Sequence, residues 1–242
     1  MEPAVIEIEH LEKSFGDKRV LTDMNLQLKK GENLAVLGKS GTGKSVLIKC
    51  IVGLLEPDNG KIVMLGKSIP DLEEDGLNEV RKRIGFLFQG AALYDSLTVR
   101  ENLEFPLRSS APKSRDEIDA IVTDALHSVD LDDVIDKMPS ELSGGMKKRI
   151  GLARSLILSP EIIFYDEPTT GLDPITSREI SKLILDVQKK HNASSIIITH
   201  DVECARITSN RMMVIHEGVC IGEGTFDELA KSDNENIRAF LG

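Results

Sequence analysis

The segment from Gly38 to Ser45, with the sequence GKSGTGKS, has the residue types and spacing needed to hold a polyphosphate. It matches the pattern G-x-x-x-x-G-K-[ST] and lies between an apolar run and a helix-like segment, which is the context this pattern requires. Backbone N–H groups and a helix start would surround the phosphates. Lys44 is expected to reach the β- and γ-phosphates, and Ser45 to place its hydroxyl on Mg²⁺. The predicted phosphate-binding residues are Gly38, Lys39, Ser40, Gly41, Thr42, Gly43, Lys44 and Ser45.

Two adjacent acids, Asp166 and Glu167, follow the apolar segment EIIFY. A buried strand of this kind would deliver both carboxylates to its carboxyl end. Asp166 suits a role in holding Mg²⁺ through water, and Glu167 is the candidate general base for an attacking water. Taken alone, the pair could also be a solvated turn, and kinases with the same loop place acids near phosphates too. The pair therefore leaves the reaction open.

His200 and Gln89 also follow predicted strands, and a parallel sheet would bring them to the same edge as the acids. The imidazole of His200 could contact the γ-phosphate and the attacking water. The amide of Gln89 could reach Mg²⁺ or that water, although a surface position is the plain alternative for this residue. Both are candidate catalytic residues, and Gln89 is also a candidate metal ligand.

A second glycine-rich helix start occurs at ELSGGMKKRI, from Glu141 to Ile150. Glycines in such a position indicate that another group approaches the backbone closely. The basic residues Lys147 to Arg149 form the only dense basic cluster of the sequence. We expect this cluster to be a solvated face of the helix.

Hydrophobic periodicity predicts the elements that position these residues. Strand patterns alternate with helix patterns, which favours an α/β fold with a mainly parallel sheet covered on both faces. From about 90 to 159 the strand patterns vanish, so a helical region is expected to be inserted there. Helix starts are predicted at Ser114, Asp173 and Thr225 from their capping residues. The helix after the glycine-rich loop is predicted over Lys44–Leu55, with a turn at Asp58–Gly60. The predicted strands are Val5–His10, Val20–Leu28, Asn33–Gly38, Lys61–Leu65, Arg83–Phe88, Glu161–Tyr165, Ser194–Thr199 and Arg211–His216.

Composition excludes several classes of function. The formal net charge of −10 argues against nucleic acid as a main partner, because phosphate backbones attract basic surfaces. The three cysteines, Cys50, Cys204 and Cys220, lack the spacing of zinc or disulfide frameworks and fit a reducing cytosol. A membrane-spanning helix needs about 20 apolar residues, and the apolar runs are shorter. We expect that the chain does not cross a membrane by itself.

The order and spacing of these motifs resemble the ATPase domains of ABC transporters over essentially the whole chain. Gly38–Ser45 is similar to the Walker A motif, Gln89 to the Q-loop, Leu142–Gly145 to the signature, and Asp166–Glu167 to Walker B. Gly171–Asp173 is similar to the D-loop, and His200 to the switch histidine. Phe15 stands where the family usually has an aromatic residue that stacks on adenine, most often tyrosine.

The resemblance implies ATP and Mg²⁺ as cofactors and ATP hydrolysis as the activity. It also implies a single ABC ATPase domain, 1–242, with a P-loop α/β core (1–89 and 160–242), an antiparallel N-terminal β subdomain and a helical signature subdomain (90–159). In this family two copies face each other head to tail. Ser143, Gly144, Gly145 and Asp173 of one copy would then contact the ATP of the other.

Finer details resemble the Mla-type ATPases, which serve permeases that work with MCE-domain lipid-binding proteins. The resemblance lies in FQGAALYDSLTVRENLEFPL, LSGGMKKRIGLARSL and GTFDELAKSDNENIRAFLG. It implies a peripheral protein on the cytoplasmic face of the inner membrane that powers phospholipid transport. A permease would dock near Leu93, Tyr94 and Leu97. Lipoprotein release, small-solute import, a non-transport ABC ATPase and a P-loop kinase remain open alternatives, and co-purification with a permease would separate the transport functions from the others.

Overall fold

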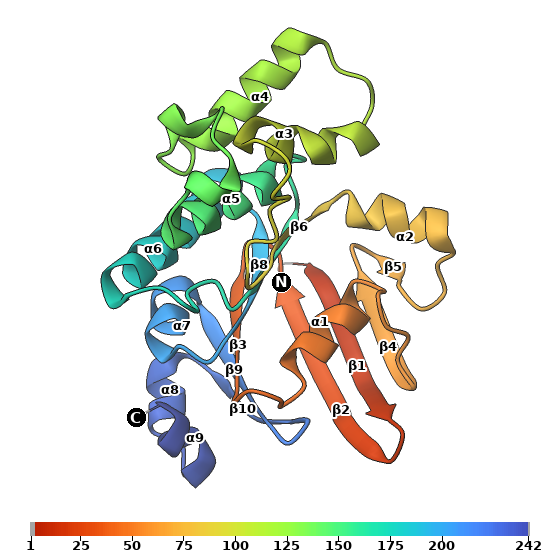
Figure 1. Cartoon of the computed structure of the whole chain (residues 1–242). Coiled ribbons are helices and arrows are strands. Elements are labelled where there is room, and N and C mark those ends of the chain that lie inside the picture. Colours follow the sequence, from red (N-terminus) through yellow and green to blue (C-terminus); the bar gives the residue numbers. More distant parts are fainter. Residues whose placement is uncertain (1–2, 242) are drawn as a thin grey trace.

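A six-stranded sheet runs through the middle of the molecule (Figure 1). The computed structural model describes residues 3–241. In the strand order β10-β9-β3-β8-β7-β6, only the β10–β9 pair is antiparallel, which confirms a mainly parallel sheet. The strands are β3 (Asn33–Leu37), β6 (Ile84–Leu87), β7 (Ile162–Asp166), β8 (Ser194–Thr199), β9 (Arg211–His216) and β10 (Val219–Gly224).

A second, antiparallel sheet contains the N-terminal strands, drawn in red and orange in Figure 1. Its order is β2-β1-β4-β5, and each neighbouring pair is antiparallel. The alternation of apolar and polar residues along β1 and β2 buries one face of this sheet. Its strands are β1 (Ala4–Phe15), β2 (Lys18–Lys29), β4 (Asn59–Met64) and β5 (Lys67–Ser68).

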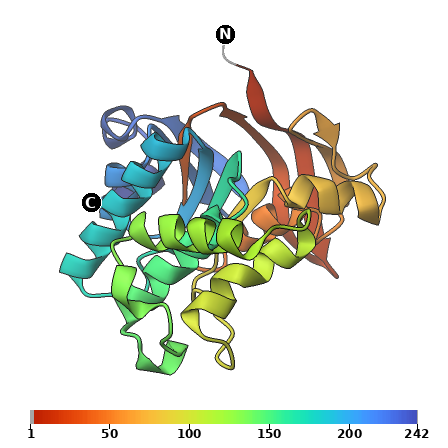
Figure 2. The same cartoon turned by 90° about the horizontal axis from the view of Figure 1, so that it is seen from above.

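Helices occupy the segment between β6 and β7, and within residues 3–241 no strand lies between Leu87 and Ile162. Seen from above, this green segment lies along one side of the molecule (Figure 2). It contains α3 (Val99–Glu104), η1 (Phe105–Ser109), α4 (Arg115–His127), η2 (Asp132–Val134), η3 (Pro139–Glu141) and α5 (Gly144–Leu156). The remaining helices are α1 (Lys44–Ile51), α2 (Glu74–Arg81), α6 (Pro174–His191), α7 (Val202–Thr208), α8 (Phe226–Ala230) and α9 (Glu235–Leu241).

The parallel sheet is buried on both faces, as the continuous apolar strands predict. Along β7, Ile162 and Phe164 face a core shared with the antiparallel sheet and α1. Ile163 and Tyr165 face the opposite core, shared with α3 to α6. A smaller core lies between β9, α7 and the two C-terminal helices. None of the helices in residues 3–241 has the length and apolar character needed to cross a bilayer.

Several predicted boundaries differ from the structure, and the first strand, predicted over Val5–His10, continues to Phe15. The helix after the glycine-rich loop ends at Ile51, because Gly53 (φ 69°) takes a left-handed conformation and closes it. The N–H of Gly53 donates to Cys50 O (3.1 Å), and that of Leu54 to Lys49 O (2.8 Å), which is the Schellman arrangement. The turn predicted at Asp58–Gly60 is partly strand, since β4 starts at Asn59.

Candidate nucleotide-binding site

A pocket at the carboxyl edge of the parallel sheet brings together most of the predicted site residues. β3, β7 and β8 deliver the glycine-rich loop, the acidic pair and His200 to the same edge, and the segment after β6 adds Gln89. The predicted residues that line it are Phe15, Ser40, Gly41, Gly43, Lys44, Ser45, Gln89, Asp166, Glu167 and His200. Lys18, Val20 and Val46 also line it and were not predicted.

The loop Gly38–Ser45 is held in a tight space between β2 and β9. A Cβ on Gly43 (φ 102°) would lie 2.7 Å from Val20 O, and one on Gly38 would lie 2.7 Å from Ile215 O. In the described structure no side chain caps the N-terminus of α1, and its first residues line the pocket, so their backbone N–H groups have no side-chain acceptor there. These N–H groups suit a phosphate.

Lys44 lies inside this loop rather than extending from it. Its Nζ donates to Gly38 O (2.6 Å) and Lys39 O (3.0 Å), and the side chain is buried. Burial lowers the pKa of Lys44, while the charges of Glu167 and Asp166 act in the opposite direction. Lys44 and the acidic pair line the same pocket, so its ammonium is placed to meet a phosphate bound there.

Glu167 has an uncommon backbone conformation for a non-glycine residue, with φ 48°. Its N–H donates to Ile198 O (2.8 Å), which fixes the turn after β7. Its carboxylate accepts from Thr170 Oγ1 (3.0 Å) and lies 2.8 Å from Nδ1 of His200. Strained backbone of this kind is concentrated at functional sites. The contact with His200 places a carboxylate and an imidazole side by side in the pocket.

Asp166 lies in the same pocket in an environment that is unfavourable for its charge. Burial and the neighbouring charge of Glu167 raise the pKa of Asp166, and Lys44 and Lys148 oppose this shift. A divalent cation beside the carboxylate would relieve both effects. The side chains of Asp166, Ser45 and Gln89 therefore fit a magnesium site.

Lys148 is buried, so the prediction of a solvated basic face is wrong for this residue. Its Nζ donates to the backbone carbonyls of Gln89 and Glu167, the latter at 3.0 Å. Burial lowers its pKa to about 8, against the opposing charges of Asp166 and Glu167. The helical spacing was a usable signal, because Lys148 shares a face of α5 with the buried residues Gly151, Leu152 and Ser155.

Arg149 also departs from the solvated face. Its side chain is only 18% exposed, and its guanidinium donates to Val129 O (3.0 Å) and pairs with Glu179 (3.2 Å). Arg149 thus connects α5 to α6 and to the end of α4. Only Lys147 of the basic run has no such contact among those described, and it is half-buried.

Phe15 lies at the edge of the pocket with 49% of its surface exposed. The Nζ of Lys13 lies 5.6 Å from the ring centroid, a cation–π arrangement. The exposed ring is thus available for stacking.

Ser143, Gly144, Gly145 and Asp173 do not line this pocket. Ser143 caps α5, with its Oγ accepting from Met146 N (3.2 Å), and Asp173 caps α6 by accepting from Ile175 N and Thr176 N, each at 3.0 Å. The two helix starts are adjacent, since a Cβ on Gly145 would lie 2.8 Å from Thr176 Cγ2. One chain therefore does not bring the glycine-rich helix start to its own phosphate-binding loop.

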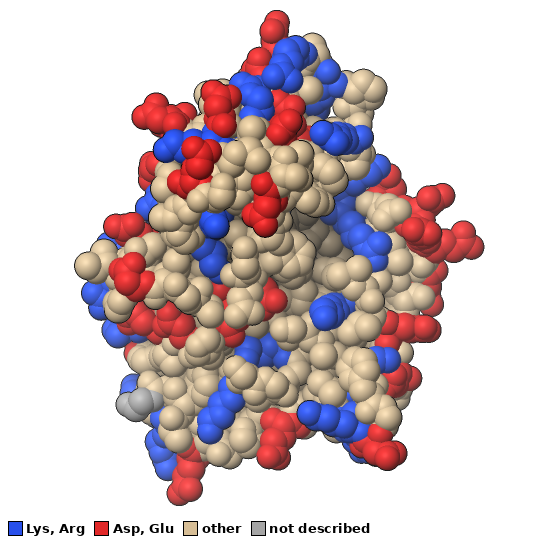
Figure 3. Space-filling view, viewed as in Figure 1, with Lys and Arg blue, Asp and Glu red and all other residues tan. Residues whose placement is uncertain are grey.

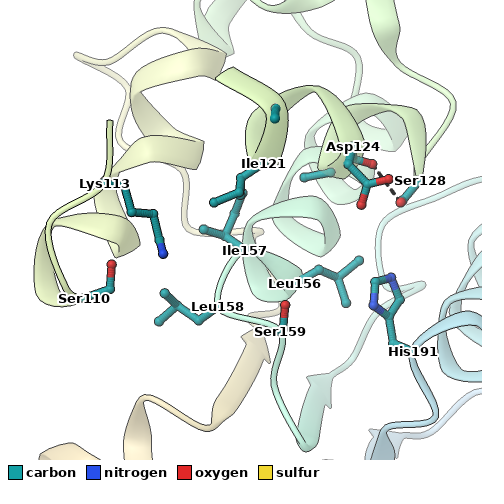
Figure 4. A pocket seen from close by; sticks show the side chains of 12 residues that line it. Ser110, Lys113, Ile121, Asp124, Ser128, Leu156, Ile157, Leu158, Ser159 and His191 are labelled. Carbon is teal, nitrogen blue, oxygen red and sulfur yellow. Dashed lines mark hydrogen bonds between the residues drawn. The ribbon is translucent and has the colours of Figure 1, made fainter. Parts of the chain in front are cut away.

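A separate cavity lies at the far end of α4 and contains none of the predicted site residues (Figure 4). Ile121 and Asp124 of α4 and His191 at the end of α6 line it. The Nε2 of His191 is buried without a hydrogen-bond partner among the described residues, and burial lowers the pKa of this imidazole.

The ABC transporter family profile matches residues 21–170. The chain belongs to the ABC transporter family. It is an ATPase that binds ATP.

Relatives of this ATPase match it over nearly its whole length. It is 39% identical over 241 residues to the Haemophilus influenzae "Intermembrane phospholipid transport system ATP-binding protein MlaF", with 100% of this chain and 91% of the relative covered. It is 41% identical over 236 residues to the Mycobacterium leprae "Probable ribonucleotide transport ATP-binding protein mkl". There, 98% of this chain and 68% of the relative are covered, so the mycobacterial protein is longer.

Solved ABC ATPases have the same fold. The structure of cbiO1 from Clostridium perfringens, part of the transporter complex cbiONQ, has a TM-score of 0.86 at 30% identity, with 98% of this chain and 99% of that chain covered. The cassette MJ0796, a dimer in a post-hydrolysis state bound to ADP and Pi, has a TM-score of 0.82 at 29% identity, with 91% and 98% covered. These similarities confirm the P-loop ATPase fold.

Proposed function

We propose that this ABC ATPase powers a separate membrane permease that transports phospholipid. The near-complete match to MlaF supports this cargo. The relative named for ribonucleotide transport makes a nucleotide-type solute the second candidate. Through the permease the protein would lie at the cytoplasmic face of the inner membrane, and an MCE-domain protein would be a further partner.

Within the pocket we assign Glu167 as the general base and His200 as the residue that orients it and contacts the γ-phosphate. The observation that carries this assignment is the 2.8 Å contact between the two side chains beside the P-loop. Asp166, Ser45 and Gln89 would hold Mg²⁺, which supplies charge neutralisation to the phosphates when bound. Phe15 would stack on the adenine.

We further propose a head-to-tail dimer in which Ser143, Gly144, Gly145 and Asp173 complete the site of the other copy. None of these four residues lines the P-loop pocket of its own chain, which supports this arrangement, as does the dimeric MJ0796 structure. In this arrangement 1–89 and 160–242 form the catalytic core, and 90–159 forms the helical subdomain that presents the signature.

An aromatic groove beside β6 suits the permease. Phe88, Tyr94 and Phe105 line it with 44%, 45% and 39% of their surfaces exposed. Figure 3 shows a hollow in the surface between the helical segment and α2, on the side that Figure 1 presents. Leu93 and Leu97 were predicted to face this partner but do not line the groove. Both are half-buried, and Leu93 packs against the core shared with α3 to α6. Large exposed apolar patches mark interaction sites.

The assignment of Glu167 predicts a specific kinetic defect. Glu167→Gln should retain ATP binding but lose turnover by roughly 10²–10⁴-fold, the usual contribution of a general base. Because ATP then persists between the two halves, light scattering should detect an ATP-dependent dimer. Glu217→Gln, at an exposed glutamate, is the matched control. Normal hydrolysis by the Glu167 variant, or only monomer with ATP and permease present, would contradict the proposal.

The cargo can be tested by purification in mild detergent from the native host. We expect the chain to retain a permease and an MCE-domain protein, with phospholipid in the complex. The double variant Tyr94→Glu/Phe105→Glu should lose the permease while its soluble ATPase activity persists. Recovery of a solute-import permease without lipid would favour the second cargo.

A further inference from the structure

Lys148 joins three parts of the ATPase that belong to different elements. It stands on α5, its side chain is 5% exposed, and its ammonium donates to the backbone carbonyls of Gln89 and Glu167. One carbonyl follows β6 and the other follows β7. A lysine ammonium has three N–H donors, so it can hold both carbonyls at once.

α5 also contacts the segment around Gln89 through Arg154 and Gly151. Arg154 donates to Ala91 O and Ala92 O, each at 2.8 Å. Both alanines have left-handed backbones, with φ of 60° and 49°, which is unfavourable without outside support. A Cβ on Gly151 would lie 2.8 Å from Leu87 Cδ1 at the end of β6 and 3.1 Å from Ala91 Cβ, so the helix packs closely against both.

We propose that Lys148 is a positioning residue for ATP hydrolysis. It ties the backbones of Gln89 and Glu167 to α5 so that both side chains enter the nucleotide pocket together. α5 begins at Gly144, and Lys148 lies about one turn further along it. The helix whose start would contact the other copy's ATP thus also holds the backbones of Gln89 and Glu167. This inference rests on the proposed role of Glu167 as general base.

The test compares Lys148→Met in two backgrounds, because residues that act through one another have non-additive effects. In the wild-type background we expect kcat to fall about 10- to 100-fold, the scale of a small misplacement of catalytic groups. The Kd for ATP should change less than about threefold, since Lys148 does not touch the P-loop. In the Glu167→Gln background, Lys148→Met should slow the residual hydrolysis by a smaller factor than in wild type, because only the placement of Gln89 is then lost. Lys182→Met, at an exposed lysine of α6, is the matched control.

Each outcome decides between the proposals. A normal kcat in Lys148→Met overturns the role of Lys148 and leaves that of Glu167 intact. The same conclusion follows if Glu167→Gln is slow and Lys148→Met lowers kcat by the same factor in both backgrounds. Normal hydrolysis by Glu167→Gln overturns the role of Glu167 and removes the basis of this inference. Thermal unfolding monitors folding of each variant. Lys148→Gln, which retains a shorter amide donor, replaces Lys148→Met in both backgrounds if the latter does not fold.

Discussion

At the scale of single residues, Gly145 has a close neighbour within its own chain. An added Cβ would lie 2.8 Å from Thr176 Cγ2, and the Oγ1 of Thr176 is fixed by its bond to Asp173 (2.6 Å). The methyl group therefore cannot turn away without loss of that bond. The sequence suggests that Gly145 contacts the ATP of another copy. The close approach of Thr176 is a second reason for a glycine at this position.

Gly145→Ala should destabilise the protein, and Thr176→Ser should relieve the effect. Overpacking costs about 1–3 kcal/mol, and alanine returns about 1 kcal/mol of helix propensity, so we expect a net loss of about 1 kcal/mol. Serine keeps the hydroxyl and removes the methyl group. Urea unfolding should show the loss in the single variant and recovery in the double variant. Equal stability of Gly145→Ala and wild type would contradict the clash.

Most of the predicted pocket residues could be found because they lie at or just after the ends of apolar strands in the parallel sheet. Asp166, Glu167 and His200 follow such strands, and parallel strands end at one edge. Lys148 could not be predicted in this way. A lysine in a basic run has the composition of a solvated face, while its burial depends on two carbonyls that come from distant segments.

At the scale of elements, Asn102 of α3 organises the loop that precedes its helix. Its side chain is fully buried, accepts from Tyr94 N (2.8 Å), and donates to Leu97 O (3.1 Å) and Thr98 O (3.0 Å). The loop lies beside the aromatic groove, so this one amide holds part of the surface that we assign to the permease.

Asn102→Ala should loosen this loop without affecting the nucleotide pocket. Several backbone groups would lose their partner, which costs about 1–3 kcal/mol for each group that stays buried. Hydrogen exchange at 94–98 should accelerate, while ATP binding remains unchanged. Asn78→Ala, at an exposed position of α2, is the control. Unchanged protection of the loop would show that packing alone holds it.

Capped helices were predicted well, and short or weakly patterned elements were not. The capping boxes at Ser114 and Thr225 are present as expected. α2 escaped prediction because it is only eight residues long and its apolar stripe consists of just Leu77 and Val80. β10 contains Gly222 and Gly224 and pairs only with β9, so its stability comes from tertiary contacts that its sequence pattern does not display.

At the scale of the whole molecule, Arg211 connects the two sheets. Its guanidinium donates to both oxygens of Glu32 (2.7 and 2.9 Å), to Gln27 O on β2 (2.5 Å), and to Glu223 on β10. Burial alone would raise the pKa of Glu32, but the bonds from Arg211 and from Lys29 N outweigh it and hold this pKa below its ordinary value of 4.5.

This link should make stability depend on pH in acid. Because the folded pKa of Glu32 is lower than the unfolded one, its stabilisation is present above about pH 4.5 and is lost as the pH falls through the folded value. Glu32→Gln should lower the free energy of unfolding by about 1–2 kcal/mol at pH 7, and the difference from wild type should shrink below that range. A difference that is constant with pH would contradict the assignment. Glu74→Gln, at an exposed site, controls for general charge effects.

Lys44, finally, has a consequence for how tightly the protein holds its nucleotide. Its ammonium already has two acceptors, the carbonyls of Gly38 and Lys39, and a phosphate oxygen must compete with them for the same donor. Binding at this residue is then an exchange of partners, and the measured affinity is the difference between two sets of bonds. The backbone carbonyls of the P-loop therefore compete with the phosphate for Lys44, and the geometry of the loop sets how strongly they do so.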